Sequence, residues 1–273
     1  MSNRHERLRQ LRLLLEDQEP RRIGELAIHF GVSHMTVRRD AEMLAEEGLV
    51  QLLHGAVVRK HHSAPGLTSQ YHLYDAQTVN RAEKERIARQ AISLLEPSDT
   101  VMLDAGSTTE ALAWLLDEAC EATFITYSHN VFVALQKISS ARIFLAGGEY
   151  DRAGTMFRGS DTTRLLQSIR ATKAILSAGG VSLDLGVTCS NAFEYELKRT
   201  LMEYSIHRVL LADHTKLGRT ESTFYASMDE FDVLVTDRPL PSEYAAHCRR
   251  HGVEVLFPGC SDDIYQFSRI SSK

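Results

Sequence analysis

Seven short apolar runs between residues 99 and 257 constrain the fold of this chain more than any other feature, because helical stretches separate most of them. The runs cover residues 100–104, 123–126, 142–146, 173–177, 208–213, 232–236 and 254–257. Continuous apolar strands that alternate with helices are typical of a mostly parallel sheet covered on both faces. The sequence therefore predicts an open α/β domain over residues 81–273 that begins with a helix at 81–95.

Small and polar residues follow the first of these runs, where a parallel sheet binds its ligands. The residues concerned are Asp104, Gly106, Ser107, Thr108 and Thr109, directly before a helix expected at 110–116. Glycine lets the backbone turn tightly, and the free amides of a helix N-terminus favour an anion. Ordinary helix capping would explain a hydroxyl at this place equally well. Three hydroxyls after an aspartate and a glycine favour a phosphate site.

Other strand ends carry similar residues. Ser128 and Asn130 follow the second run, and Gly147-Gly148 follows the third. Asp213 and Lys216 follow the run at 208–213, where a lysine can meet a phosphate and a carboxylate can accept a sugar hydroxyl. Each alone is compatible with loop chemistry, but together they predict one polar pocket.

The N-terminal segment has the pattern of a helix-turn-helix. Leu26 and Phe30 share one helical face, Gly31 supplies a left-handed helix end, and Ser33 is a candidate N-cap for the next helix. In that second helix Val37, Ala41 and Leu44 form an apolar stripe, and the opposite face carries the polar and cationic residues His34, Thr36, Arg38 and Arg39. A polar, basic helix start of this kind suits the major groove of DNA.

Two apolar segments around His54-Gly55 indicate a two-stranded wing after the second helix. Paired helices also occur in domains that bind no nucleic acid, and some winged helices bind protein. The N-cap, the basic first turn and the wing together favour DNA. We expect residues 1–60 to form the DNA-binding domain and the polar, Pro-Gly-containing residues 61–80 to form a linker.

Charge is divided unevenly along the chain. The whole sequence of 273 residues has a net charge of −5, but residues 1–62 hold ten basic and nine acidic residues, a net of +1. Four arginines (Arg4, Arg7, Arg9 and Arg12) gather on the opening helix. This local basic patch can contact phosphates, while the acidic remainder discourages indiscriminate binding. Such a weakly basic module is expected to need dimerisation for tight DNA binding.

Several classes of protein do not fit the composition. No apolar run approaches the roughly 18 residues of a membrane span, and the N-terminus is charged, so a cytoplasmic protein is expected. The cysteines Cys120, Cys189, Cys248 and Cys260 are far apart, and the histidines lack metal-ligand spacing. We expect no metal, no cofactor and no membrane partner.

These segments resemble the DeoR family of bacterial transcriptional repressors over nearly the whole chain. The N-terminal part of the resemblance rests on residues 32–40, 47–49 and 54–56. The C-terminal part rests on 84–88, 104–109, 147–148, 179–186, Glu194 with Lys198, and 213–216. The order and spacing of both sets agree with the family.

The resemblance implies a homodimeric or homotetrameric repressor that binds operator DNA through Ser33, His34, Thr36, Arg38, Arg39, His54 and Gly55. It also implies a sensor domain, similar to ribose-phosphate isomerases, that binds a phosphorylated sugar. Asp104 and residues 106–109 would hold the phosphate and Lys216 would contact the ligand, with Ser128, Asn130, Glu194 and Lys198 as further candidates. Residues 145–149, 188–191 and 213–216 most resemble the branch that regulates deoxyribonucleoside genes, which implies a deoxyribose phosphate.

The sequence departs from the family pattern in three places. The wing lacks an arginine and a glycine, since it has Leu52-Leu53 before His54-Gly55-Ala56, and this puts its minor-groove contact in doubt. The usual Gly-Thr-Thr is Gly106-Ser107-Thr108. Tyr127-Ser128-His129 replaces Thr-Asn-Ser, a change that bears on effector choice.

Two other functions compete with that of an effector-controlled repressor. A sugar-phosphate isomerase or lyase with a DNA-binding module would use Glu194 beside Lys198, and Asp213 near Lys216, as a general base with its partners. The ionisable groups are few for that chemistry, and no nucleophile–base pair is evident. A purely architectural DNA binder leaves the polar strand ends unexplained. The sequence therefore favours a repressor of a carbohydrate or nucleoside catabolic operon that is not an enzyme.

Overall fold

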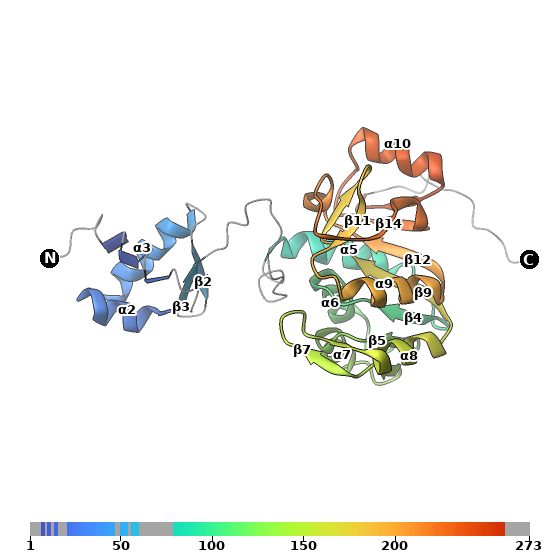
Figure 1. The fold of residues 1–273 in the computed structure, drawn as a ribbon, viewed down its shortest axis with the longest axis horizontal. Helices are drawn as coiled ribbons and strands as arrows, with labels where there is room; N and C mark the ends of the chain where they lie inside the picture. Colours follow the sequence, from blue (N-terminus) through green and yellow to red (C-terminus); the bar gives the residue numbers. More distant parts are fainter. Residues whose placement is uncertain are drawn as a thin grey trace, which may run out of the picture. The chain divides into compact units, whose positions relative to one another are not determined.

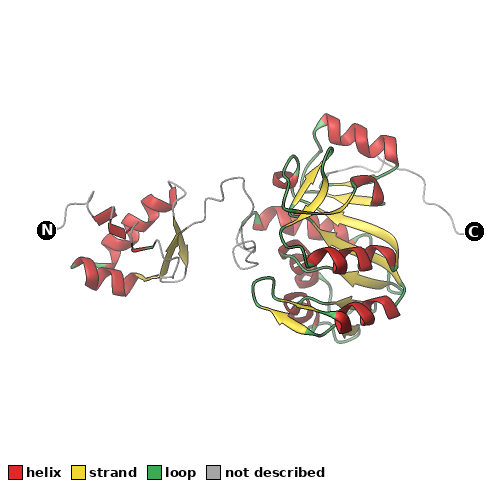
Figure 2. Cartoon of the chain, in the orientation of Figure 1, coloured by secondary structure: helices red, strands yellow, loops and turns green. Residues whose placement is uncertain are grey.

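The computed structural model describes residues 7–8, 10–11, 14–15, 21–46, 50–53, 56–59 and 79–259. Contacts divide the chain into two compact units, residues 1–68 and 69–273, which are described separately. Figure 1 shows the elements of both units, and Figure 2 shows their secondary structure.

The N-terminal unit is a winged helix-turn-helix. Its elements are β1 (Arg21–Arg22), α2 (Ile23–Phe30), α3 (His34–Glu46), β2 (Val50–Leu53) and β3 (Ala56–Arg59), and the strands pair antiparallel in the order β1-β3-β2. The three-residue turn between α2 and α3 is made possible by Gly31, whose φ of 62° ends α2 in the left-handed conformation. Ser33 Oγ accepts the Thr36 N–H at 3.2 Å, so Ser33 caps α3 as the sequence predicts.

The core of this unit is the predicted stripe. Val37, Ala41 and Leu44 of α3 are fully or almost fully buried against Leu26 of α2, and Leu8, Leu11 and Leu15 join the same cluster. The Arg7 guanidinium reaches the buried Asp40 carboxylate at 2.5 Å and ties the N-terminal segment to α3. The His54-Gly55 wing tip lies outside the described residues.

The C-terminal unit contains a seven-stranded parallel sheet, in the order β15-β14-β12-β9-β4-β5-β6. Its strands are β4 (Thr100–Leu103), β5 (Thr123–Thr126), β6 (Arg142–Leu145), β9 (Ala171–Ser177), β12 (Ser205–Leu211), β14 (Val233–Val235) and β15 (Glu254–Leu256). All seven predicted apolar runs are therefore strands of one sheet. The predicted open α/β fold is confirmed.

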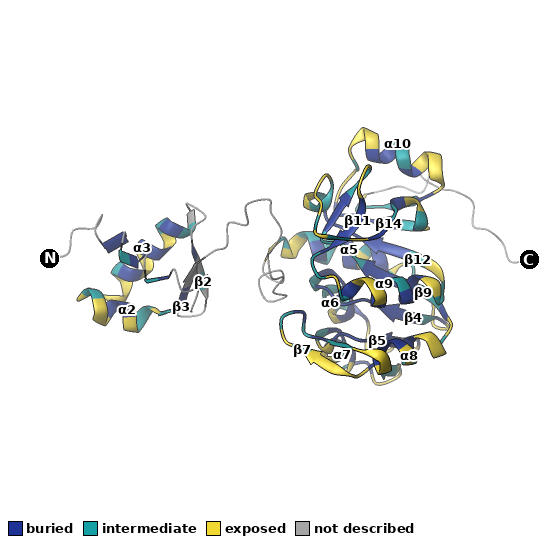
Figure 3. Cartoon of the chain, viewed as in Figure 1, coloured by how far each residue is buried: buried dark blue, intermediate teal, exposed yellow. Residues whose placement is uncertain are grey.

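Helices cover both faces of this sheet. One core packs α5 (Arg81–Ile92), α6 (Ser107–Leu115) and α7 (His129–Leu135) on Val101 and Leu103 of β4. The other core packs α8 (Ser160–Ser168), α9 (Glu194–Glu203) and α10 (Ser242–His251) on the face that carries Met102. Because both faces are covered, β4, β5 and the carboxyl-terminal halves of β9 and β12 are largely buried, as Figure 3 shows.

Short antiparallel strands form two small sheets that the apolar runs do not predict. β7 (Glu149–Asp151) pairs with β8 (Met156–Arg158), and β10 (Gly180–Ser182), β11 (Gly186–Cys189) and β13 (Thr223–Ala226) form a separate sheet. Two 3-10 turns, η1 (His214–Lys216) and η2 (Met228–Glu230), complete the unit. The glycine-containing segment 179–186, one of those that resemble the family pattern, lies largely in the β10–β11 hairpin.

The topology fixes where a ligand can enter. From β4 the chain proceeds outward through β5 to β6, and then returns to place β9 on the other side of β4. Such a reversal of strand order opens a crevice beyond the carboxyl ends of the two strands. The loops that follow β4 and β9, at 104–106 and 178–179, line this place.

Candidate functional site

Gly106 sets the shape of the loop after β4. A Cβ added at this position would lie 2.4 Å from Ser177 Oγ at the end of β9, so the two strand ends approach too closely for any side chain here. α6 begins at the next residue, and the Glu110 N–H donates to the Gly106 carbonyl at 2.9 Å. The amides of residues 107–109 therefore lie in the first turn of α6, where a helix has no carbonyl partners for them. This turn is a suitable anion-binding element.

The three hydroxyls of this turn are not equivalent. Thr109 is fully buried, and its Oγ1 donates to the Asp104 and Gly106 carbonyls at 2.9 Å each, so it holds the loop in shape. Thr108 is nearly buried and Ser107 is partly exposed. Among the predicted phosphate-binding hydroxyls, Ser107 is the most accessible to a ligand.

Asp104 lies behind the loop in a buried polar cluster. Its carboxylate accepts a hydrogen bond from the Tyr127 hydroxyl, from the N–H and Oγ of Ser177 at 2.9 Å each, and from Lys198 Nζ at 2.5 Å. The Asp104 side chain is completely buried. With four donors around it and no exposed surface, Asp104 positions its neighbours rather than offering a free oxygen to a ligand.

Lys198 and Glu194 extend this cluster along α9. Lys198 Nζ also donates to the Ser177 carbonyl at 3.1 Å, and it lies 3.7 Å from Glu194 Oε2. Burial alone would lower the pKa of Lys198, but the negative charge of Asp104 raises it well above its usual value, so Lys198 stays protonated. Burial raises the pKa of Glu194, whose Oε1 accepts from Asn191 at 2.7 Å.

Ser128 and Asn130 have local roles in this structure. Ser128 is fully buried and its Oγ accepts the Val131 N–H, so it caps α7. Asn130 Nδ2 lies 3.4 Å from Glu110 Oε2, which links α7 to the first turn of α6. Capping explains Ser128 without any ligand.

Asp213 and Lys216 meet the N-terminal end of α5. Asp213 caps η1 through Oδ1, which accepts from the Thr215 N–H at 2.9 Å and from Asn80 Nδ2 at 3.3 Å. The other oxygen, Oδ2, is buried and has no hydrogen-bond donor among the described residues. A buried carboxylate oxygen without a donor is costly, so this atom is ready to accept a hydrogen bond from a ligand.

Lys84 is a site residue to which the sequence analysis gave no role. Burial and the positive charge of Lys216 lower the pKa of Lys84 to about 8, and Lys84 Nζ donates to the Val79 carbonyl at 2.7 Å. The negative charge of Glu110, in the first turn of α6, partly offsets this lowering of the Lys84 pKa. Burial likewise lowers the pKa of Lys216. Lys84, which faces Glu110 of α6, and Lys216 are thus two interacting lysines that are each harder to protonate than usual, and a bound anion would stabilise their protonated forms.

In the helix-turn-helix unit, the candidate DNA-binding residues lie along the exposed side of α3. Arg38 and Arg39 are exposed, and Arg38 Nε donates to Glu42 Oε1 at 3.1 Å. Ser33 Oγ and Thr36 Oγ1 lie 2.9 Å apart and hydrogen-bond to each other. The His34 ring lies against α2, since a Cβ added to Gly24 would be 3.6 Å from its Cε1.

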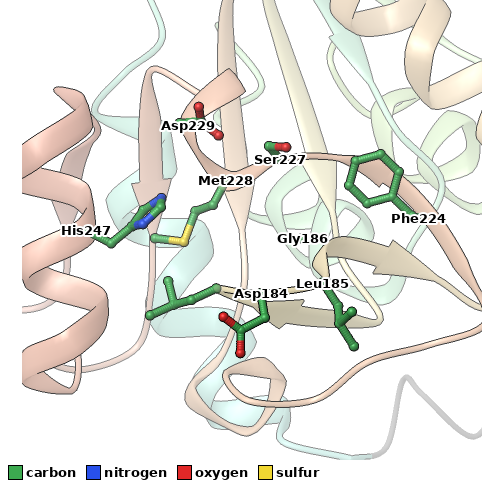
Figure 4. A pocket seen from close by; sticks show the side chains of 9 residues that line it. Asp184, Leu185, Gly186, Phe224, Ser227, Met228, Asp229 and His247 are labelled. Carbon is green, nitrogen blue, oxygen red and sulfur yellow. The ribbon is translucent and has the colours of Figure 1, made fainter.

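Two cavities of the α/β unit lie away from the candidate effector-binding residues. One, of about 330 Å³, is bordered by the β10–β11 turn, Phe224, residues 227–229 and His247, as Figure 4 shows. The other, of about 430 Å³, lies between Arg158 and α9. Neither is lined by the loop after β4 or by Lys216. The part of the chain that the structure describes contains no cluster of three metal-ligating side chains and no helix able to cross a membrane.

A helix-turn-helix unit joined to an α/β unit with polar residues at its strand ends is typical of a ligand-responsive regulator of transcription. Comparison with known families agrees: residues 7–63 match the DeoR-like helix-turn-helix domain, and residues 79–238 match the DeoR C terminal sensor domain. The chain belongs to the DeoR family of transcriptional repressors, as the sequence motifs indicate.

Individual relatives cover most of the chain. It is 32% identical over 236 residues to the HTH-type transcriptional regulator IolR of Bacillus subtilis, with 85% of this chain and 91% of the relative covered. It is 31% identical over 256 residues to the deoxyribose operon repressor of Escherichia coli K12, with 94% and 99% covered. Among solved structures, a ribose 5-phosphate isomerase from Methanocaldococcus jannaschii is 15% identical, with a TM-score of 0.39 over 50% of this chain and 55% of that one.

Proposed function

We propose that the crevice between β4 and β9 binds a phosphorylated sugar, and that this binding changes the affinity of the helix-turn-helix unit for its operator. The observation that carries the proposal is a pair of interacting lysines, the buried Lys84 beside Glu110 of α6 and the half-buried Lys216, close to Asp213, whose Oδ2 has no donor among the described residues. These groups supply what a phosphate and a sugar hydroxyl each require.

The phosphate is assigned to the first turn of α6. Its free amides and the hydroxyl of Ser107 donate hydrogen bonds to phosphate oxygens, and the two lysines supply positive charge. A dianionic phosphate stabilises the protonated form of both lysines, so it offsets the burial that lowers their pKa values.

The sugar is assigned to the space next to Asp213. A ring or chain hydroxyl that donates to Asp213 Oδ2 would satisfy the one carboxylate oxygen of that residue that lacks a donor. The Asp104–Lys198 pair behind the loop holds β4, β9 and α9 in register and keeps this frame rigid. A deoxyribose phosphate is the first effector to test, because a deoxyribose operon repressor is among the relatives.

In this proposal the effector influences the DNA-binding unit by shifting the populations of two arrangements of the protein. An effector that prefers one arrangement of a homo-oligomer changes DNA affinity by its differential affinity for the two states, typically about 1–3 kcal/mol. We propose a homodimer or homotetramer, because paired helix-turn-helix units read two half-sites and one weakly basic unit has few phosphate contacts. Within this scheme residues 1–60 bind DNA, residues 61–80 link the units and residues 81–273 sense the effector.

The test uses the full chain and an operator that the protein itself selects from random duplexes. The bound operator is titrated with 2-deoxyribose 5-phosphate, other pentose and hexose phosphates, the parent sugars and inorganic phosphate. We expect at least one sugar phosphate to alter operator affinity, and at 100 times its dissociation constant to stabilise the protein by about 2.7 kcal/mol. No response to any sugar phosphate would refute the proposal.

The same mixtures separate a sensor from an enzyme. A repressor that only senses its effector returns each sugar phosphate unchanged after prolonged incubation, which nuclear magnetic resonance of the phosphorus and carbon atoms can follow. Conversion of the bound sugar phosphate to an isomer would favour the enzyme.

A further inference from the structure

The exposed side of α3 contains an apolar side chain among charged ones. Arg38, Arg39 and Glu42 lie three, four and seven residues after Met35 and therefore share its side of α3, opposite the buried stripe that begins at Val37. Met35 is 63% exposed, although it is the second residue of the helix. Single exposed apolar side chains are common on protein surfaces, so it is the position of Met35 that distinguishes it.

The first turn of α3 is the part of a recognition helix that meets base edges. Its polar side chains have neighbours within the unit: the hydroxyls of Ser33 and Thr36 bond to each other, and the exposed His34 ring lies close to Gly24 of α2. Met35 is the large apolar side chain of this turn, and it is exposed to solvent.

We infer that Met35 reads thymine in the operator, by packing its thioether on the C5-methyl group in the major groove. This inference rests on the proposed binding of operator DNA by α3 and names one base that α3 recognises. Of the four bases, thymine alone presents a methyl group there, and its recognition needs an apolar partner rather than a hydrogen bond. Methionine suits that task because it is flexible and polarizable.

Met35 and the neighbouring Arg38 are suited to different bases. Arg38 lies three residues after Met35 on the same side of α3, and its Nε is held by Glu42 at 3.1 Å. Arginine pairs best with guanine or with phosphate, so it cannot discriminate thymine by its methyl group. Met35 would thus recognise thymine, a base that the arginines do not discriminate.

The test removes the methyl group from the DNA instead of from the protein. In the operator selected by the full-length protein, each thymine is replaced in turn by deoxyuridine, which keeps the base pair and deletes only the C5-methyl. We expect one thymine per half-site at which the replacement weakens wild-type binding about fourfold, the factor that corresponds to burying one methyl-sized apolar group.

The Met35→Ala variant should bind the thymine operator about as weakly as the wild type binds the uracil operator, and should no longer distinguish the two. Ile28→Ala is the matched control, because Ile28 is an equally apolar side chain, 84% exposed, but lies on α2. It should keep the wild-type preference for thymine. Both changes are at exposed positions, and unaltered thermal unfolding of each variant will verify that the fold is intact.

Two results would overturn the inference: a wild-type protein indifferent to uracil at every thymine, or a Met35→Ala variant with an undiminished preference for thymine. Failure of DNA binding itself gives a different result, because no duplex would then be enriched by the wild-type protein in the selection step.

Discussion

Lys198 Nζ lies 2.5 Å from Asp104 Oδ2, and both side chains are almost completely excluded from solvent although they are 94 residues apart in sequence. The pair joins the middle of α9 to the residue that follows β4. Ser177, at the end of β9, donates to the same carboxylate oxygen from its N–H and its hydroxyl. One carboxylate thus holds together the three elements that surround the proposed effector crevice.

Breaking this pair should destabilise the sensor unit. In a Lys198→Met variant Asp104 keeps its charge but loses its cation, and a buried charge without its partner costs about 3–5 kcal/mol. The loss should be measured as the change in free energy of unfolding in a urea titration of the full chain. Arg164→Met is the control, because its pair with Asp161 is more than two-thirds exposed and contributes less than about 1 kcal/mol. Equal losses in the two variants would contradict the role given to Lys198.

Lys216→Ala should abolish the effector response and leave operator binding intact, because Lys216 is assigned to the phosphate and lies in the unit that does not bind DNA. The measurement is operator affinity with and without the active sugar phosphate. The variant should bind the sugar phosphate more weakly than the wild type does, whereas its affinity for the unphosphorylated sugar should not change. Release of DNA at the effector concentration that suffices for the wild type would show that Lys216 is not a ligand.

Effector affinity should fall as the pH rises above about 8. The pKa of Lys84 in the empty site is about 8, below its ordinary value, and a bound phosphate favours the protonated lysine. Above that pH the empty site must take up a proton to bind, so affinity decreases; from pH 7 to 9.5 we expect a loss of about tenfold or more. The phosphate itself is already largely dianionic above pH 7. Calorimetric titrations of a Lys84→Arg variant should give a flatter pH profile, and an equally steep one would exclude Lys84.

The substitution Asp213→Asn should weaken binding of the sugar phosphate but not binding of inorganic phosphate. The amide keeps an oxygen for the Thr215 N–H and replaces the unpaired Oδ2 by a donor, so a sugar hydroxyl loses its acceptor. A lost hydrogen bond to a charged group corresponds to about a ten- to hundredfold change in affinity. Asp229→Asn is the control, since Asp229 lines the separate cavity of Figure 4. Equal weakening of both ligands by Asp213→Asn would place the phosphate, not the sugar, next to Asp213.

The sheet could be predicted from sequence because its strands are buried on both faces. A strand such as β4 has three consecutive fully buried residues and therefore appears as an uninterrupted apolar run. The small sheet of β10, β11 and β13 could not be predicted, because its short strands mix glycine, serine and threonine with apolar residues and form no continuous apolar run.

The candidate site residues that the sequence itself suggested directly follow strands. Asp104, Asp213 and Lys216 were proposed in this way, and Glu194 with Lys198 came from the resemblance to a family. Lys84 precedes β4, the first strand of the large sheet, and comes near Glu110 because α5 packs against α6, a tertiary relationship that no local pattern contains. Tyr127 was noted as part of a loop, but its bond to Asp104 depends on the pairing of β4 with β5.

Arg38→Ala should weaken operator binding by about 1–3 kcal/mol and relax base preference at one position of each half-site. The bond from Arg38 Nε to Glu42 orients the guanidinium and leaves its two terminal nitrogens for a bidentate contact with guanine. Mobility-shift titrations at fixed salt on operators with each guanine replaced in turn will measure this preference, and Arg39→Ala is the comparison on the same helix. If Arg38 contacts a phosphate instead, the variant will lose affinity for all sequences alike, and the salt dependence of binding will decrease by about one unit of slope.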